Sequence, residues 1–139
     1  MNLLVTGAAG FIGANFVRYW QTRHPKDTIV ALDALTYAGN RASLPEETPR
    51  FIFIHGSILD APLLDATMDR HQIDTVVHFA AESHVDRSIK APETFLETNV
   101  TGTFRLLEAA RRRGVQTGRT PRFHHVSTDE VYGSLQAGD

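Results

Sequence analysis

The chain has 139 residues, of which 42% are hydrophobic, and this length allows one domain with a packed core but not two. A formal net charge of −2 provides no basic surface for nucleic acid, and the lack of cysteine excludes disulfides, thiolate metal sites and cysteine nucleophiles. Met1 leads directly into an apolar segment without a basic leader, and no apolar stretch approaches the roughly 18 residues of a membrane span, so we expect a cytoplasmic protein with neither nucleic acid nor membrane as partner.

The first element in the chain is a strand that breaks into a glycine-rich turn and then a helix. Residues 2–5, which are apolar after Asn2, predict the strand, and Gly7, Gly10 and Gly13 follow at three-residue spacing. In a dinucleotide fold the first glycine turns the chain sharply, the second leaves room for a pyrophosphate beside bare backbone, and the third lets the helix pack closely on the strand. The unpaired N–H groups at the helix N-terminus then face the phosphates.

A carboxylate stands at the end of the second apolar run. This run, residues 28–32, leads into Asp33, twenty residues after Gly13, where a dinucleotide fold places the acid that accepts hydrogen bonds from the adenosine ribose. The alternative for Asp33 is a solvated turn residue. Because Ala34 follows and no adjacent arginine is present to pair with a 2′-phosphate, the pattern favours NAD over NADP.

The rest of the chain alternates between helix and strand. We expect helices over residues 11–24, 60–72 and 92–113, and strands over residues 50–55, 74–79 and 122–126, with residues 35–49 forming a loop that holds at most a short helix. This rhythm predicts an α/β protein with a doubly wound parallel sheet, the Rossmann fold, in strand order 3-2-1-4-5, as one domain over residues 1–139.

Helical spacing also predicts which faces are buried. In the first helix the apolar stripe is expected to face the core, and in the last helix four large apolar residues are expected to point inward before Gly114 stops the helix. These residues are Ile12, Phe16, Tyr19 and Trp20, then Phe95, Val100, Phe104 and Leu107. The arginines at positions 111–113 are interpreted as complementing the negative helix end rather than as a nucleic-acid patch.

The loop after the last strand holds the residues best suited to chemistry. Thr128, Asp129 and Glu130 place a hydroxyl and two neighbouring carboxylates at the end of a central strand. Two carboxylates in unlike surroundings can acquire different pKa values, so that one donates a proton while the other accepts one. A helix cap with an acidic first turn is the alternative interpretation of the same residues.

Several segments together resemble a known family. The spacing GxxGxxG in TGAAGFIG resembles the extended short-chain dehydrogenase/reductase superfamily, and DALTYAGN, HFAAESHVDRS and FHHVSTDEVYG resemble the dTDP-glucose 4,6-dehydratase family. The resemblance implies a lyase of deoxysugar biosynthesis that converts dTDP-glucose to dTDP-4-keto-6-deoxyglucose with NAD. Related epimerases, decarboxylases and reductases share the glycine turn but generally lack the Asp-Glu pair.

The resemblance also assigns roles to single residues. Thr128 would bind the hydroxyl at sugar carbon 4, Asp129 would be the acid for the departing water, and Glu130 would be the base at carbon 5, while Ser83 would contact the substrate. Asn99 would support the active-site framework. The alternative for Thr98 and Asn99 is a polar stripe on a half-exposed helix. The cofactor residues implied are Gly7, Gly10, Phe11, Ile12, Gly13, Asp33, Ala34, Leu35, Thr36, Ser57, Ile58, Ala80, Ala81, Glu82 and Thr98.

The chain departs from the family pattern in two places. Ser57–Ile58 replaces an Asp-Ile pair that receives the adenine amino group, so we expect weaker NAD binding than in a relative with the aspartate. The superfamily's Tyr-x-x-x-Lys motif is lacking, so the chain resembles only the N-terminal part of the family enzyme, truncated before the later strands and the substrate lobe and inactive alone. A short non-catalytic NAD-binding module, or an epimerase or decarboxylase relative, is the alternative.

Two further expectations concern partners and metals. The family commonly dimerises through helices that include residues 92–113, and truncation leaves the fifth strand as an unpaired edge, so we expect a homodimer or self-association. No metal is expected, because His124 and His125 are adjacent on a strand and face opposite ways. His78 is expected to be a core residue with its hydrogen bonds satisfied.

Overall fold

The sheet has the predicted class and strand order. The computed structural model describes residues 1–128, 131 and 133. Among them, five parallel strands pair in the order β3-β2-β1-β4-β5. The strands are β1 (Asn2–Thr6), β2 (Thr28–Asp33), β3 (Phe51–His55), β4 (Thr75–His78) and β5 (Arg122–His125). The predicted Rossmann-type order is therefore confirmed.

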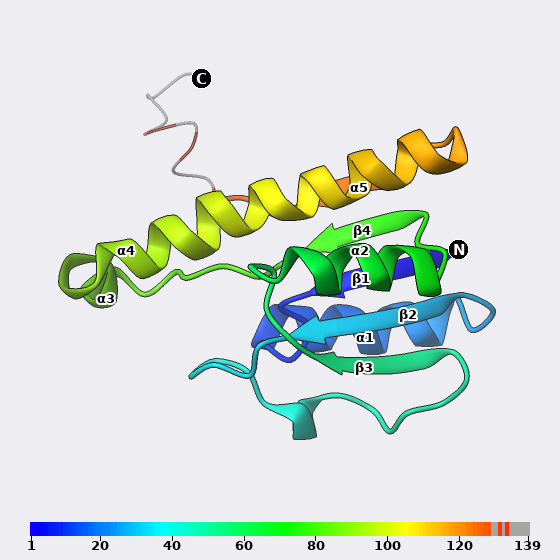
Figure 1. Ribbon diagram of the computed structural model, residues 1–139. Helices are drawn as coiled ribbons and strands as arrows, with labels where there is room; N and C mark the ends of the chain where they lie inside the picture. Colours follow the sequence, from blue (N-terminus) through cyan, green and yellow to red (C-terminus); the bar gives the residue numbers. More distant parts are fainter. Residues whose placement is uncertain (129–130, 132, 134–139) are drawn as a thin grey trace, which may run out of the picture.

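Helices cover both faces of this sheet, as a doubly wound fold requires. Figure 1 shows α1 behind the sheet and α2 and α5 in front of it. The helices are α1 (Phe11–Arg23), the 3-10 turn η1 (Arg41–Ser43), α2 (Ala61–Arg70), α3 (Val85–Lys90), α4 (Pro92–Phe95), the π-helix η2 (Leu96–Gly102) and α5 (Thr103–Thr117). The sequence did not predict α3, which lies in a segment expected to be loop.

Alternating side chains of the strands build a separate core on each face. Leu3 and Val5 of β1 pack in one buried cluster with Val17 of α1, whereas Leu4 between them packs in the other with Leu64 of α2 and Leu106 of α5. This alternation follows from the two-residue period of a strand. Each such side chain, taken fully out of water, contributes about 1.5–3 kcal/mol to folding.

The expected inner face of α1 is partly wrong. Phe16 and Trp20 are half-buried and pack against the core, but Ile12 is 62% exposed and Tyr19 is exposed as well. The helix positions that are buried are the small residues Gly13, Ala14 and Val17. The helix lies so close to the sheet that only small side chains fit beneath it, and the larger ones remain at the rim.

The expected inner face of the last helix is also wrong. Val100, Phe104 and Leu107 are exposed, and Phe95 is half-buried. The buried positions of the helix are instead Gly102, Leu106, Ala109, Ala110 and Gly114. Helical spacing identified the more apolar of two faces, but close packing on the sheet selects the face with the smaller side chains.

The same helix does not end at Gly114. It continues to Thr117, and Gly118 caps it in the left-handed conformation with φ +71°. Gly114 is buried, and a Cβ there would lie 2.8 Å from the Cα of Thr120. Gly118 is therefore the glycine that stops the helix, whereas Gly114 allows the returning chain to pass close to the helix.

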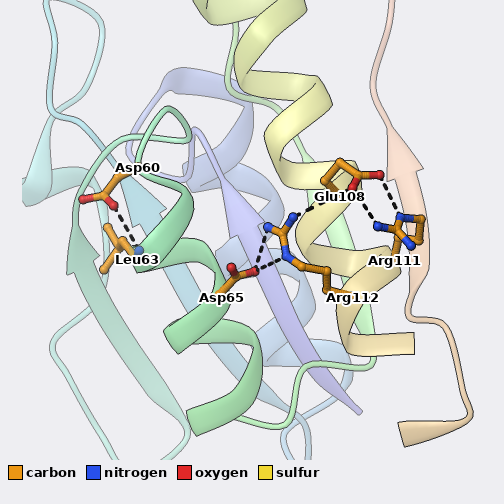
Figure 2. A network of polar contacts seen from close by, with 6 residues as sticks. All are labelled: Asp60, Leu63, Asp65, Glu108, Arg111 and Arg112. Atoms are coloured by element: carbon orange, nitrogen blue, oxygen red, sulfur yellow. Dashed lines mark hydrogen bonds and ion pairs between the residues drawn. The ribbon is translucent and has the colours of Figure 1, made fainter. Parts of the chain in front are cut away.

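Two of the three arginines tie α5 to α2 and the third pairs within α5. None lies in the last turn of the helix, so the interpretation that they complement the negative helix end is wrong. In Figure 2, Arg112 reaches across to Asp65 of α2, where its Nε and Nη2 donate to one carboxylate oxygen at 3.1 and 2.9 Å. Arg113 lies 3.1 Å from Asp69 of α2, and Arg111 pairs with Glu108 on its own helix at 2.9 Å. The charges of this arginine cluster are therefore paired with carboxylates.

The start of α2 agrees with the sequence. Asp60 Oδ1 accepts a hydrogen bond from the Leu63 N–H at 3.0 Å, as Figure 2 shows, and Pro62 lies in the first turn. Leu64, Thr67 and Met68 form the buried face of α2. The cap sets where the chain leaves β3 and enters α2, and this connection holds Ser57 and Ile58.

Candidate functional site

A pocket opens at the carboxyl end of the sheet. Its volume is about 270 Å³. Thr6 is in register with Leu32 and with His78, and His78 is in register with His125, so the loops after β1, β2, β4 and β5 leave from the same edge. In open α/β sheets ligands bind at this edge, where the chain connections diverge to opposite faces. In Figure 1 it is the end towards which the arrowheads point.

The glycine turn forms the floor of this pocket. Gly7 has φ +65°, and a Cβ on it would lie 2.6 Å from the backbone N of Ala80. Gly13 is equally restricted, because a Cβ there would overlap the carbonyl oxygen of Gly7. A Cβ on Gly10 would meet only that oxygen, at 3.4 Å. Gly7 and Gly13 are therefore required for packing, whereas the space beside Gly10 is open to a ligand.

The carboxylate of Asp33 is held rigidly at the pocket wall. One oxygen accepts the Ala9 N–H and the other the Leu35 N–H, both at 2.8 Å. Asp33 is only 8% exposed, so the alternative of a solvated turn residue is wrong. An ionised carboxylate has about four acceptor positions, and two remain for hydroxyl groups of a ligand.

A buried histidine joins three elements behind the pocket. His78 Nδ1 lies 2.6 Å from Thr6 Oγ1, and its Nε2 lies 3.0 Å from Thr103 Oγ1. The pKa of His78 is lowered to about 4, mainly by burial and to a lesser extent by the charge of nearby His125. The ring is neutral at pH 7, with one nitrogen as donor and one as acceptor. The expectation of a satisfied core histidine is confirmed.

An asparagine of η2 holds the loop after β4 in place. Asn99 donates from Nδ2 to the Glu82 carbonyl and accepts the Glu82 N–H at its Oδ1, both at 2.8 Å. It lies in the π-helix η2, a type of irregular turn that often occurs at functional sites. The alternative of a polar surface stripe does not describe Asn99, whose side chain is used to fix the backbone beside the pocket.

Most of the residues predicted to bind a cofactor line this pocket. They are Gly7, Gly10, Asp33, Ala34, Thr36, Ser57, Ile58, Ala80, Ala81, Glu82 and Thr98. Four others do not line it: Gly13 lies beneath the turn, Leu35 is half-buried, and Phe11 and Ile12 are exposed at the start of α1. Ser83, predicted to contact substrate, is exposed and outside the lining.

The sequence missed two polar residues in the lining. Thr94 and Glu97 line the pocket with Thr98. Glu97 directly precedes Thr98. Thr94 precedes Thr98 by four residues, so the two threonines are neighbours on one helical face. That spacing was a usable signal for Thr94. The side chain of Ser57 is uncharged, and its Oγ accepts a hydrogen bond from the Leu59 N–H at 3.1 Å.

Only the first residue of the predicted catalytic loop can be placed. Thr128 is exposed and follows β5, and its carbonyl oxygen accepts the Val131 N–H at 3.4 Å. The Val126 N–H donates to the His78 carbonyl at 3.1 Å, which extends the pairing of β5 with β4 up to the start of this loop. Asp129 and Glu130 lie outside the described residues.

Within residues 1–128, 131 and 133, no group of three or more metal-ligating side chains is placed to hold an ion. Over the same part of the chain, no helix has the length and apolar character needed to cross a membrane.

Comparison with known proteins matches the whole chain. A family model described as GDP-mannose 4,6 dehydratase matches residues 4–139. A dTDP-glucose 4,6-dehydratase of Mycobacterium tuberculosis (strain ATCC 25618 / H37Rv) is 53% identical over 139 residues, which are 100% of this chain and 40% of that protein. The chain thus spans 40% of the length of this curated relative.

Solved structures also resemble the chain over nearly its whole length. DesIV, a dTDP-glucose 4,6-dehydratase from Streptomyces venezuelae solved with NAD bound, superposes with a TM-score of 0.85 at 51% identity, covering 99% of this chain and 42% of that one. A UDP-glucose 4-epimerase from Brucella ovis in complex with NAD gives a TM-score of 0.83 at 31% identity, covering 99% and 38%.

Proposed function

The chain belongs to the GDP-mannose 4,6 dehydratase family, and from this membership we propose that it forms the NAD-binding part of a nucleotide-sugar 4,6-dehydratase acting on dTDP-glucose. The observation that carries the proposal is the pocket at the carboxyl end of the sheet, where eleven predicted cofactor residues meet. Similarity to dTDP-glucose 4,6-dehydratases over the full chain supports the substrate assignment.

The residues present fit NAD. Helix α1 begins directly after the lining residue Gly10, and a helix N-terminus with open space beside Gly10 suits a pyrophosphate. The Asp33 carboxylate, held by two backbone donors, keeps acceptor positions for the hydroxyls of the adenosine ribose. We assign the adenine to Ser57 and Ile58, and the nicotinamide ribose to the backbone of residues 80–82. The single domain over residues 1–139 is then one cofactor-binding unit.

The chemistry belongs to the loop after β5. NAD, when bound, supplies the reversible hydride acceptor that the reaction requires. Thr128 would hydrogen-bond the hydroxyl at sugar carbon 4, and Asp129 would give a proton to the hydroxyl that leaves carbon 6 as water. Glu130 would take the proton from carbon 5. Carboxylates on adjacent residues suit this division, because acid and base act on adjacent carbons.

Two other functions are compatible with the fold. A non-catalytic NAD-binding module would use the same pocket, but it would need no paired acids after β5. An epimerase relative would share the fold, as the Brucella ovis protein does at 31% identity. The Asp129-Glu130 pair and the 51–53% identity to dehydratases favour the dehydratase.

The self-association expected from the sequence is also a proposal. Leu96, Val100, Phe104 and Leu107 form an exposed apolar stripe along η2 and α5, and β5 is an edge strand in the described part of the chain. Apolar surface of this kind supports pairing with a second copy. The cytoplasmic location stays a prediction from the sequence.

Titration calorimetry with NAD and with NADP tests the cofactor assignment. We expect NAD to bind at least about tenfold more tightly than NADP, because the 2′-phosphate of NADP would meet the nearly buried Asp33 carboxylate. In Asp33→Asn, which keeps the side-chain shape but not the charge, the difference between the two cofactors should narrow. Equal affinities in the unaltered chain, or no binding of either, would contradict the proposal.

A further inference from the structure

An arginine and a tyrosine stack on each other and bring together two segments that both contribute residues to the pocket lining. The guanidinium carbon of Arg87 lies 3.7 Å from the centre of the Tyr37 ring. Tyr37 belongs to the loop after β2, and its neighbours Thr36 and Ala38 both line the pocket. Arg87 belongs to α3, which lies between the lining residues Glu82 and Thr94. The stack therefore joins two segments that form opposite sides of the site.

We call residues 34–40 the first wall and residues 80–94 the second wall. The first is anchored at its base, because the Leu35 N–H donates to Asp33 at 2.8 Å and the Asn40 N–H donates to the Ala9 carbonyl at 3.0 Å. The second is anchored by the double hydrogen bond between Glu82 and Asn99. Within residues 1–128, 131 and 133, no hydrogen bond or ion pair connects the two walls to each other.

The charges of the site give the arginine a second use. The described residues that line the pocket carry three carboxylates, those of Asp33, Glu82 and Glu97, and neither lysine nor arginine. A diphosphate is anionic, so its approach to such a lining benefits from a cation at the entrance. Arg87 provides that cation while it rests on the face of Tyr37.

We propose that Arg87 and Tyr37 form a clasp that closes over a bound dinucleotide and slows its release. The inference rests on the proposed function, because it takes a dinucleotide as the occupant. A guanidinium over an exposed tyrosine is a weak contact that opens readily, which admits the ligand. Once the ligand is bound, the two anchored walls can part only if this stack breaks.

The dissociation rate of NAD, measured by surface plasmon resonance on immobilised protein, tests the clasp. Arg87→Ala and Tyr37→Ala should each raise the rate about two- to fivefold, and the double variant should raise it no further than either single one. Tyr37→Phe keeps the aromatic face and should release NAD as slowly as the unaltered protein. Thermal unfolding of each variant verifies that it is folded.

The chain offers a matched control. Arg41 stacks on Phe53 with its guanidinium carbon 4.8 Å from the ring centre, and neither residue lines the pocket. Arg41→Ala should leave NAD release unchanged. If Arg87→Ala alone accelerates release while Tyr37→Ala does not, the arginine binds the ligand directly and the clasp is refuted. If NAD binds but neither variant changes its release, the clasp is wrong and the cofactor assignment stands; if the unaltered chain does not bind NAD, both fail.

Discussion

Gly13→Ala is expected to lower the free energy of unfolding by about 3 kcal/mol, at the upper end of the cost of overpacking a core. An added Cβ would overlap the carbonyl oxygen of Gly7 and would lie 2.9 Å from the Cα of Ala8. Both neighbours are backbone atoms of the turn that enters α1, so neither can rotate away. The helix would have to move off the sheet and loosen the packing of Val17. Urea unfolding followed by circular dichroism measures this loss.

Gly118→Ala is the matched control for that substitution. Gly118 has φ +71°, but no heavy atom lies within 4 Å of the position of its Cβ. Alanine there is strained only by its backbone conformation, which costs about 1 kcal/mol. If the two variants lose equal stability, the close contact of α1 with the glycine turn is not what makes Gly13 necessary.

The stability of the chain is expected to fall by about 2 kcal/mol between pH 7 and pH 5 because of His78 alone. Its pKa is lowered to about 4 in the folded protein, from an ordinary value of 6.5. Between these values the unfolded chain binds a proton that the folded chain does not, so acid favours unfolding. The contribution is fully present above pH 6.5 and is lost as the pH falls towards 4. Each pKa unit corresponds to about 1.4 kcal/mol.

His78→Gln tests this dependence, because glutamine can still contact the threonines but does not titrate. Urea unfolding at pH 7 and pH 5 should show a difference about 2 kcal/mol smaller in the variant than in the unaltered chain. Burial also lowers the pKa of His71, which acts in the same direction in both proteins and cancels in the comparison. An unchanged pH dependence in the variant would mean that His78 is not kept neutral by its surroundings.

Features that depend on short spacing could be predicted from the sequence. The turn around Gly7 requires a positive φ, and the position of Asp33 follows from the length of one helix and one strand. Strand order follows from alternation of helices and strands, and the pocket follows from the strand order. Each of these needs only local pattern and general rules of chain connection.

Features that depend on the distance between packed elements could not be predicted from the sequence. Phe104 and Ala109 lie on different faces of α5, and the sheet accepts the face with alanine because the two elements approach closely. Apolar spacing alone cannot reveal that distance. Arg112 and Arg113 of α5 pair with carboxylates of α2, and nothing in the local sequence identifies these partners, which precede the arginines by more than forty residues.

The two contacts that shape the site are likewise non-local. Asn99 holds the backbone of Glu82 from seventeen residues away, and Arg87 meets Tyr37 only after α3 has formed in a segment expected to be loop. The sequence predicted eleven of the residues that line the pocket and missed others, and the contacts that hold its walls together depend on the fold.

In the proposed function, bare backbone at the glycine turn receives the diphosphate of NAD. Calorimetric titration of NAD into the unaltered chain and into Gly10→Ala tests it most directly, because a Cβ on Gly10 meets only the Gly7 oxygen at 3.4 Å and leaves the fold intact. We expect binding to the unaltered chain and an affinity at least about tenfold lower in Gly10→Ala, with equal unfolding free energies. Equal affinities for NAD in the two proteins would contradict the claim.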